Sequence, residues 1–214
     1  MINFILNILP IITKVAATMG PFLAKYAPVL VELAGKHLPQ IIKTVESISS
    51  ILDVIKPNES AEELGAKAMS ANKKPEDFGK NSDYIDYLRK EVTIDKNTLS
   101  NDEADVSIRK AIGGSLMLKG VNDVLGTEVT IPFIKTASQL ELNSNVIIEI
   151  VKSYATNNVK LDDFEKYISK TLPIDSLDKH SDTLVNAYQT VNSNMSIEQA
   201  EDEVMKLNLP TINK

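Results

Sequence analysis

The sequence predicts an all-α protein in which an N-terminal apolar helical cluster precedes a bundle of helix–loop–helix units. Apolar residues recur in steps of three and four through residues 1–56, and this is the spacing of a helix seam. Later segments at Ser60, Ser100 and Ser196 carry the Ser-x-x-Glu or Ser-x-x-Gln pattern that opens helices with a capping box. Together these signals place helices along the whole chain.

Glycine and proline divide the apolar region into three helices. Gly20 followed by Pro21 is typical of one helix ending and the next one starting. Gly35 and Pro39 repeat that arrangement. Because this region is the richest in apolar residues, we expect it to organise the rest of the chain. The expected helices cover about residues 2–19, 21–34 and 38–56.

The remaining chain divides at a polar stretch. Residues 72–81 are polar and include Pro75 and Gly79, which indicates a loop and a boundary. Inside a later apolar helix, residues 113–114 are both glycine, so either the helix breaks there or a neighbouring backbone approaches closely. The predicted segments are an apolar helical segment at 1–56, a short helix and linker at 57–81, and a bundle of helix–loop–helix repeats at 82–214.

The seam of the apolar segment is the predicted interaction site. A helix that is apolar around most of its circumference must be buried on several sides. The cover can be the same chain, another subunit or lipid, and the sequence leaves these three alternatives open. The positions predicted to make the contact are Ile5, Leu9, Ile12, Leu23, Leu30, Leu33, Ile41, Ile48 and Leu52.

Composition excludes several classes of function. The net charge is −6, and only Arg89 and Arg109 are arginine, whereas nucleic-acid binding needs clustered Lys and Arg. We therefore expect no nucleic-acid partner. The chain has no cysteine, which excludes disulfides, thiolate metal sites and a cysteine nucleophile.

Charged residues also interrupt every candidate membrane span. A transmembrane helix needs about 20 nearly uncharged residues, and Lys14, Lys25 and Glu32 break the apolar region into shorter pieces. The N-terminus lacks the basic start of a secretory signal. We expect a protein that is cytoplasmic, or exported without a cleaved secretory signal.

Helix starts recur at intervals of roughly 30 to 40 residues, which suggests stacked helix–loop–helix units. The recurring apolar residues that close the loops are Leu99, Ile131, Leu161 and Ile197. This rhythm resembles that of EF-hand proteins, whose loops place an apolar residue at position eight and a glutamate at position twelve. Tyr154, Thr156 and Asn158 stand where carboxylate ligands belong, and Val159 replaces the required glycine. No calcium is therefore expected.

The sequence contains no motif for catalysis, cofactor binding or metal binding. We therefore predict no catalytic, cofactor-binding or metal-binding residue. His37 and His180 are the two histidines, and we interpret both as partly exposed residues near helix ends. The pair Asp162–Asp163 lies in a first helical turn, where negative charge suits the helix dipole. Enzymatic activity is left open and is the third hypothesis, as an unrecognised carboxylate-based site.

The leading hypothesis is a non-catalytic interaction protein that docks through its apolar N-terminal helices. A scaffold, adaptor, cargo or effector subunit of a bacterial or phage-type assembly, such as one linked to secretion, would fit this contrast between an apolar start and a polar remainder. The partner would be another protein or a second copy. The alternative is a membrane-active protein, pore-forming or toxin-like, that uses residues 1–56 on a bilayer.

Overall fold

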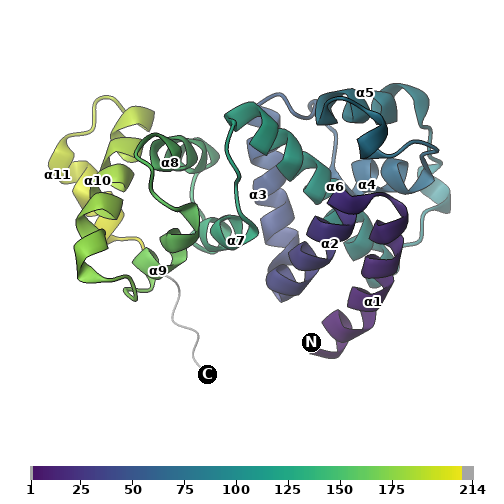
Figure 1. Cartoon of the computed structure of the whole chain (residues 1–214), viewed down its shortest axis with the longest axis horizontal. Coiled ribbons are helices and arrows are strands. Elements are labelled where there is room, and N and C mark those ends of the chain that lie inside the picture. The colour runs from purple at the N-terminus through teal and green to yellow at the C-terminus, as the bar shows by residue number, and fades with distance from the viewer. Residues whose placement is uncertain (1, 209–214) are drawn as a thin grey trace. The chain divides into compact units, whose positions relative to one another are not determined.

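The computed structural model describes residues 2–208, apart from the side chains of residues 2–5 and of Ala34. Within that range it contains eleven α-helices, four short 3-10 helices and no strand, which confirms the all-α prediction (Figure 1). The chain forms two compact units, residues 1–124 and residues 125–214. In the described residues no helix has both the length and the apolar character that crossing a bilayer requires.

The first unit contains helices α1 to α6, and α1 and α2 match the expected bounds closely. The third expected helix ends early, because Asp53 adopts a left-handed φ of 56°. The amide of Val54 then donates to the carbonyl of Ser49 at 2.8 Å, which closes the helix as in a Schellman motif. The six helices are α1 (Ile2–Thr18), α2 (Pro21–Ala34), α3 (Leu38–Ile51), α4 (Ala61–Ser70), α5 (Asn81–Glu91) and α6 (Glu103–Leu125).

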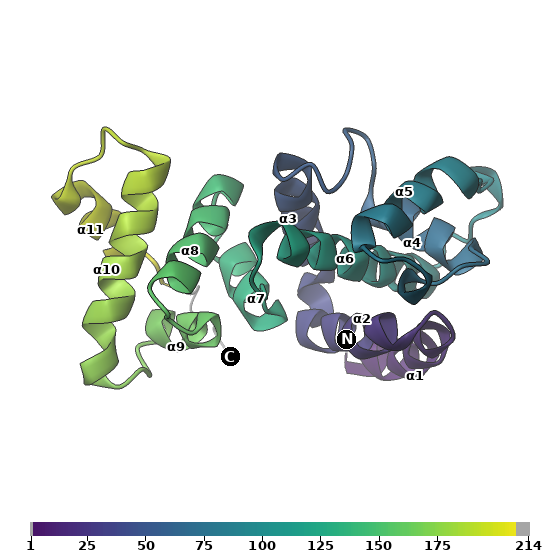
Figure 2. The same ribbon diagram turned by 45° about the horizontal axis from the view of Figure 1, so that its top comes forward.

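Helix α6 is the element at the centre of this unit. All eight residues from Ala111 to Leu118 are buried, so α6 is covered on every side there. Gly114 lies against Leu30 of α2 and Ile42 of α3. Figure 2 shows α6 running between the α1–α2 pair on one side and α4 with α5 on the other. Residues 1–56 and α6 therefore form this core together, and the expectation that residues 1–56 organise the chain stays a prediction.

Two glycines let α4 and α6 cross with their backbones in contact. A Cβ atom on Gly113 of α6 would overlap the carbonyl oxygen of Ala61, and one on Gly65 of α4 would overlap the carbonyl oxygen of Arg109. The two contacts are reciprocal, since each glycine lies four residues after the residue that the other one touches. Of the two alternatives for residues 113–114, a close backbone approach is the one found, and the helix continues through them.

The compact units do not coincide with the three segments expected from the sequence. Residues 57–81 contribute α4 and a short 3-10 helix at Pro75–Asp77 to the first unit. Pro75 is buried, although the surrounding stretch is polar. The polar composition of residues 72–81 indicated a linker. The local pattern could not show that contacts with distant parts of the chain bury a residue in this stretch.

The second unit packs helices around an aromatic core. Phe133, Tyr154 and Phe164 are almost fully buried, and the rings of Phe133 and Phe164 meet edge to face with centroids 5.1 Å apart. Helix α8 packs on α10, and α10 packs on α11. The helices are α7 (Ile131–Gln139), α8 (Ser144–Thr156), α9 (Phe164–Ile168), α10 (Ile174–Val191) and α11 (Ile197–Met205).

The capping boxes are only partly as predicted. At Ser196 the box is complete: the serine amide donates to Gln199 Oε1 at 2.9 Å, and the Gln199 amide donates back to Ser196 Oγ at 3.2 Å. Ser60 accepts from the Glu63 amide at 3.1 Å, which forms half of a box. In the remaining pattern the capping oxygen comes from Asp102 instead of the serine.

Candidate functional site

A pocket of about 920 Å³ opens on the first unit between the start of α2, the start of α5 and the second half of α6. Its size lies within the range of small-molecule sites. Its walls come from four separate stretches of the chain, around Phe22, Val54, Asn81 and Lys119. No local sequence pattern indicated the pocket, because these stretches meet only in the folded unit.

Four charged side chains of the pocket wall form two ion pairs, Arg89 with Asp86 and Lys119 with Asp123. Arg89 donates to both oxygens of Glu59, at 2.6 Å and 2.8 Å, and also contacts Asp86. The hydrogen bond from Arg89 lowers the pKa of the Glu59 carboxyl. Lys119 lies 3.1 Å from Asp123. These two ion pairs account for part of the charge of the wall, which also includes Asp53, Lys56 and Lys80.

Asn81 fixes the start of α5 against α6. Its side chain is only 3% exposed, and its Nδ2 donates to the carbonyl oxygen of Leu116 at 3.0 Å. Its Oδ1 is buried and has no hydrogen-bond partner among the described residues. Such an orphaned acceptor is unusual. The hydrogen bond from Nδ2 connects the start of α5 to α6.

A carboxylate from a distant loop closes the start of α2. Glu76 Oε1 accepts a hydrogen bond from the amide of Phe22 at 3.1 Å, and a negative charge at this helix end is favourable. The ring of Phe22 lies below Lys119, with Nζ 5.6 Å from the ring centroid. Phe22 therefore lines the pocket, and it is only half-buried at the start of α2.

The predicted interaction residues divide into buried and accessible ones. Five are buried inside the first unit, two are half-buried, and Leu33 is 38% exposed. The side chain of Ile5 lies outside the described residues. The buried residues are Ile12, Leu23, Leu30, Ile41 and Ile48, and the half-buried ones are Leu9 and Leu52. The buried residues pack against their own chain, which is one of the three alternatives for what covers the apolar helices. An interaction role for the accessible residues stays a prediction.

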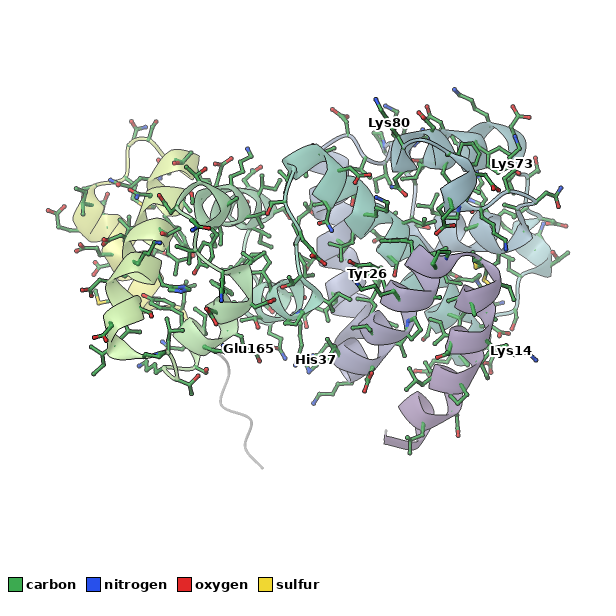
Figure 3. All side chains as sticks on the ribbon, in the orientation of Figure 1. Lys14, Tyr26, His37, Lys73, Lys80 and Glu165 are labelled. Atoms are coloured by element: carbon green, nitrogen blue, oxygen red, sulfur yellow. The ribbon has the colours of Figure 1, made fainter. Side chains whose placement is uncertain are left out.

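An apolar stripe remains on the solvent side of α2. It consists of Phe22, Tyr26, Val29 and Leu33, which follow one another in steps of four, three and four and so share one helix face. All four are half-buried or exposed. The rings of Phe22 and Tyr26 stack with centroids 4.7 Å apart. Tyr26 is labelled on α2 in Figure 3. Three of the four residues were not among the predicted contacts, because the sequence seam followed the buried face instead.

His180 is a buried polar ring in the second unit. It is 4% exposed and lies within α10, so the interpretation as a partly exposed helix-end residue is wrong for it. Its Nδ1 lies 3.0 Å from the Tyr154 hydroxyl, and its ring stacks on Tyr167 at 5.8 Å. His37, in contrast, is half-buried at the end of a short 3-10 helix. His180 is buried because it packs against aromatic side chains, and the identity of the residue alone does not indicate such burial.

Acidification is expected to destabilise the second unit through His180. Burial lowers the pKa of His180 below its ordinary value of 6.5, although Asp163 opposes this and Lys179 adds to it. The unfolded chain therefore binds more protons below about pH 6.5, and the free energy of unfolding falls as the pH falls through that value. Urea denaturation of the wild type between pH 7.5 and 5 should show this loss. His180→Phe should flatten it, and an unchanged slope in that variant would contradict the assignment.

The acidic residues do not gather into a site. Asp163 pairs with Lys166 at 2.6 Å, and the hydrogen bond from this lysine lowers the pKa of the Asp163 carboxyl. In the part of the chain that the structure describes, no three His, Cys, Asp or Glu residues lie close enough together to hold a metal ion.

Fold and surface together define a helical protein with a charged pocket and an accessible apolar stripe along one helix. Comparison with protein-family models, with curated proteins and with solved structures gives no match.

Proposed function

We propose that this protein is a non-catalytic helical interaction protein, which docks on a protein partner through its N-terminal helices with α2 as the contact helix. The observation that carries the proposal is the stripe of Phe22, Tyr26, Val29 and Leu33. Apolar positions at this spacing on an accessible helix face are what one helix uses to bind another helix or a groove.

Burial decides which N-terminal residues are available for docking. Leu23 and Leu30 hold α2 against its own unit, so they stabilise the fold. Val29 and Leu33 are each 38% exposed and complete a row with two aromatic rings. Aromatic side chains contribute more to protein interfaces than most other residues. A subunit of a larger assembly, such as a scaffold or adaptor, is the role that this face suits.

Position-specific cross-linking in cells tests the docking face. A benzophenone side chain placed at Leu33 or Val29 should form protein adducts, because these positions would lie in the interface. The matched control is Ile51 of α3, which is 47% exposed but lies off the stripe. Mass spectrometry of the adducts identifies what is bound.

Equal adducts at Leu33 and Ile51, or none at either, would contradict docking through α2. Adducts to lipid at Leu33 would favour the membrane-active alternative instead. Both outcomes are read from the same gel and spectrum, so the three alternatives for what covers the N-terminal helices are separated in one experiment.

A further inference from the structure

We infer that the partner on the α2 stripe is a second copy of this chain, with the two α2 helices antiparallel about a twofold axis. This inference rests on the proposed function, because it uses the same stripe. It adds the identity of the partner and the register of the contact. Homo-oligomers with twofold symmetry are the commonest assemblies, and their interface is the same patch used twice.

The stripe is complementary to its own reversed copy. In an antiparallel pair centred between Ala27 and Pro28, Phe22 of one copy lies opposite Leu33 of the other. Tyr26 lies opposite Val29 in the same way. Each layer then joins one aromatic ring to one smaller aliphatic side chain, so the four layers have similar widths. A parallel pair would instead place Phe22 on Phe22 and Val29 on Val29, which alternates wide and narrow layers and packs less evenly.

The charges beside the stripe select the same arrangement. Lys25 and Glu32 are seven residues apart, so they occupy the same flank of the stripe. In the antiparallel pair Lys25 of each copy faces Glu32 of the other, which gives two opposite-charge pairs. In a parallel pair the twofold axis would place the flanks of the two copies on opposite sides of the seam, so neither Lys25–Glu32 pair would form. Both residues are exposed, and Lys25 Nζ lies 4.8 Å from the Tyr26 ring centroid, directly beside the stripe.

The neighbouring charges do not oppose this register. Lys119 of α6 lies over the Phe22 ring, and both residues line the pocket. Lys36 follows the last layer, beyond Leu33, and has no counterpart in the reversed copy. Because the stripe is short, the buried area would lie at the small end of specific interfaces. We therefore expect a weak dimer whose population depends on protein concentration.

Charge reversal at the two flanking positions tests both partner and register. Sedimentation equilibrium at low salt should show the wild type shifting from a 23.6 kDa monomer towards twice that mass as concentration rises. Lys25→Glu and Glu32→Lys should each weaken the dimer about tenfold, since two attractive pairs become repulsive. The double variant, with both reversals, should restore it to within about threefold. Lys43→Glu is the matched control, because Lys43 is exposed on α3 and lies off α2.

Three results would overturn the inference. One is a wild type that stays monomeric at every concentration, and another is single reversals that bind as well as the wild type. The third is a double variant that is weaker than both single ones. Cross-links from Leu33 to a different protein, without any cross-link between two copies of this chain, would contradict the dimer but would still support docking through α2. The absence of any cross-link would contradict docking through α2 itself. The failure of the dimer inference and the failure of the proposed function are therefore distinguishable.

Discussion

Replacing Gly113 with alanine is expected to lower the free energy of unfolding of the first unit by about 3 kcal/mol or more. The added Cβ would overlap the carbonyl oxygen of Ala61, and a backbone atom cannot rotate out of the way. Helices α4 and α6 must therefore separate, which opens the core on both sides of the contact. The gain in helix propensity from alanine, about 1 kcal/mol, offsets only part of this cost.

Thermal and urea denaturation measure this effect, and the expected shift in melting temperature is roughly 10 °C or more. Gly65→Ala should behave similarly, because its added Cβ would overlap the carbonyl oxygen of Arg109 where the same two helices cross. Gly79→Ala is the control, since a Cβ there meets no atom within 4 Å. If Gly113→Ala were as stable as Gly79→Ala, the close crossing of α4 and α6 would be incorrect.

Truncating Leu30 to alanine should cost roughly 2–5 kcal/mol of stability, as is usual for a fully buried leucine. Leu30 is 1% exposed and touches Gly114 of α6, so the variant leaves a cavity at the centre of the first unit. The loss should be visible in the monomer at low protein concentration, because the cover of Leu30 is its own chain.

Two neighbouring leucines give matched comparisons. Leu52→Ala should cost less than Leu30→Ala because Leu52 is only half-buried. Leu33→Ala should leave the unfolding free energy almost unchanged and reduce only association. A large loss of monomer stability in Leu33→Ala would mean that the end of the stripe belongs to the core, which would contradict both its 38% exposure and the proposed docking role.

The fold class and most helix bounds could be predicted from the sequence because their signals are local. Gly20 and Pro21 set the end of α1 and the start of α2, and Ser196 with Gln199 opens α11 as a capping box. The position of α6 could not be predicted in this way. Its residues Ala111–Leu118 are apolar or small on every side, so the pattern shows burial without showing which neighbours provide it. Only the contacts of Gly113 and Gly114 reveal these neighbours.

The candidate site was harder to predict than the fold. The seam through Leu23 and Leu30 was visible as a periodic pattern, but periodicity does not say whether a face meets its own chain or a partner. The stripe through Val29 and Leu33 has the same spacing one face away, and only the exposure of the side chains in the folded unit distinguishes the two faces. Likewise Arg89 and Glu59 are 30 residues apart, and their pairing follows from the packing of the unit, not from any motif.

The central place of α6 has a consequence for synthesis on the ribosome. Helices α1 to α3 emerge first, yet the residue that fills the space beside Leu30 and Ile42 is Gly114 of α6. At about 5–20 residues per second, translation from residue 56 to residue 125 takes roughly 3 to 14 seconds. For that interval the nascent chain carries an apolar hairpin without its cover, and a chaperone that binds exposed apolar segments would have its longest opportunity there.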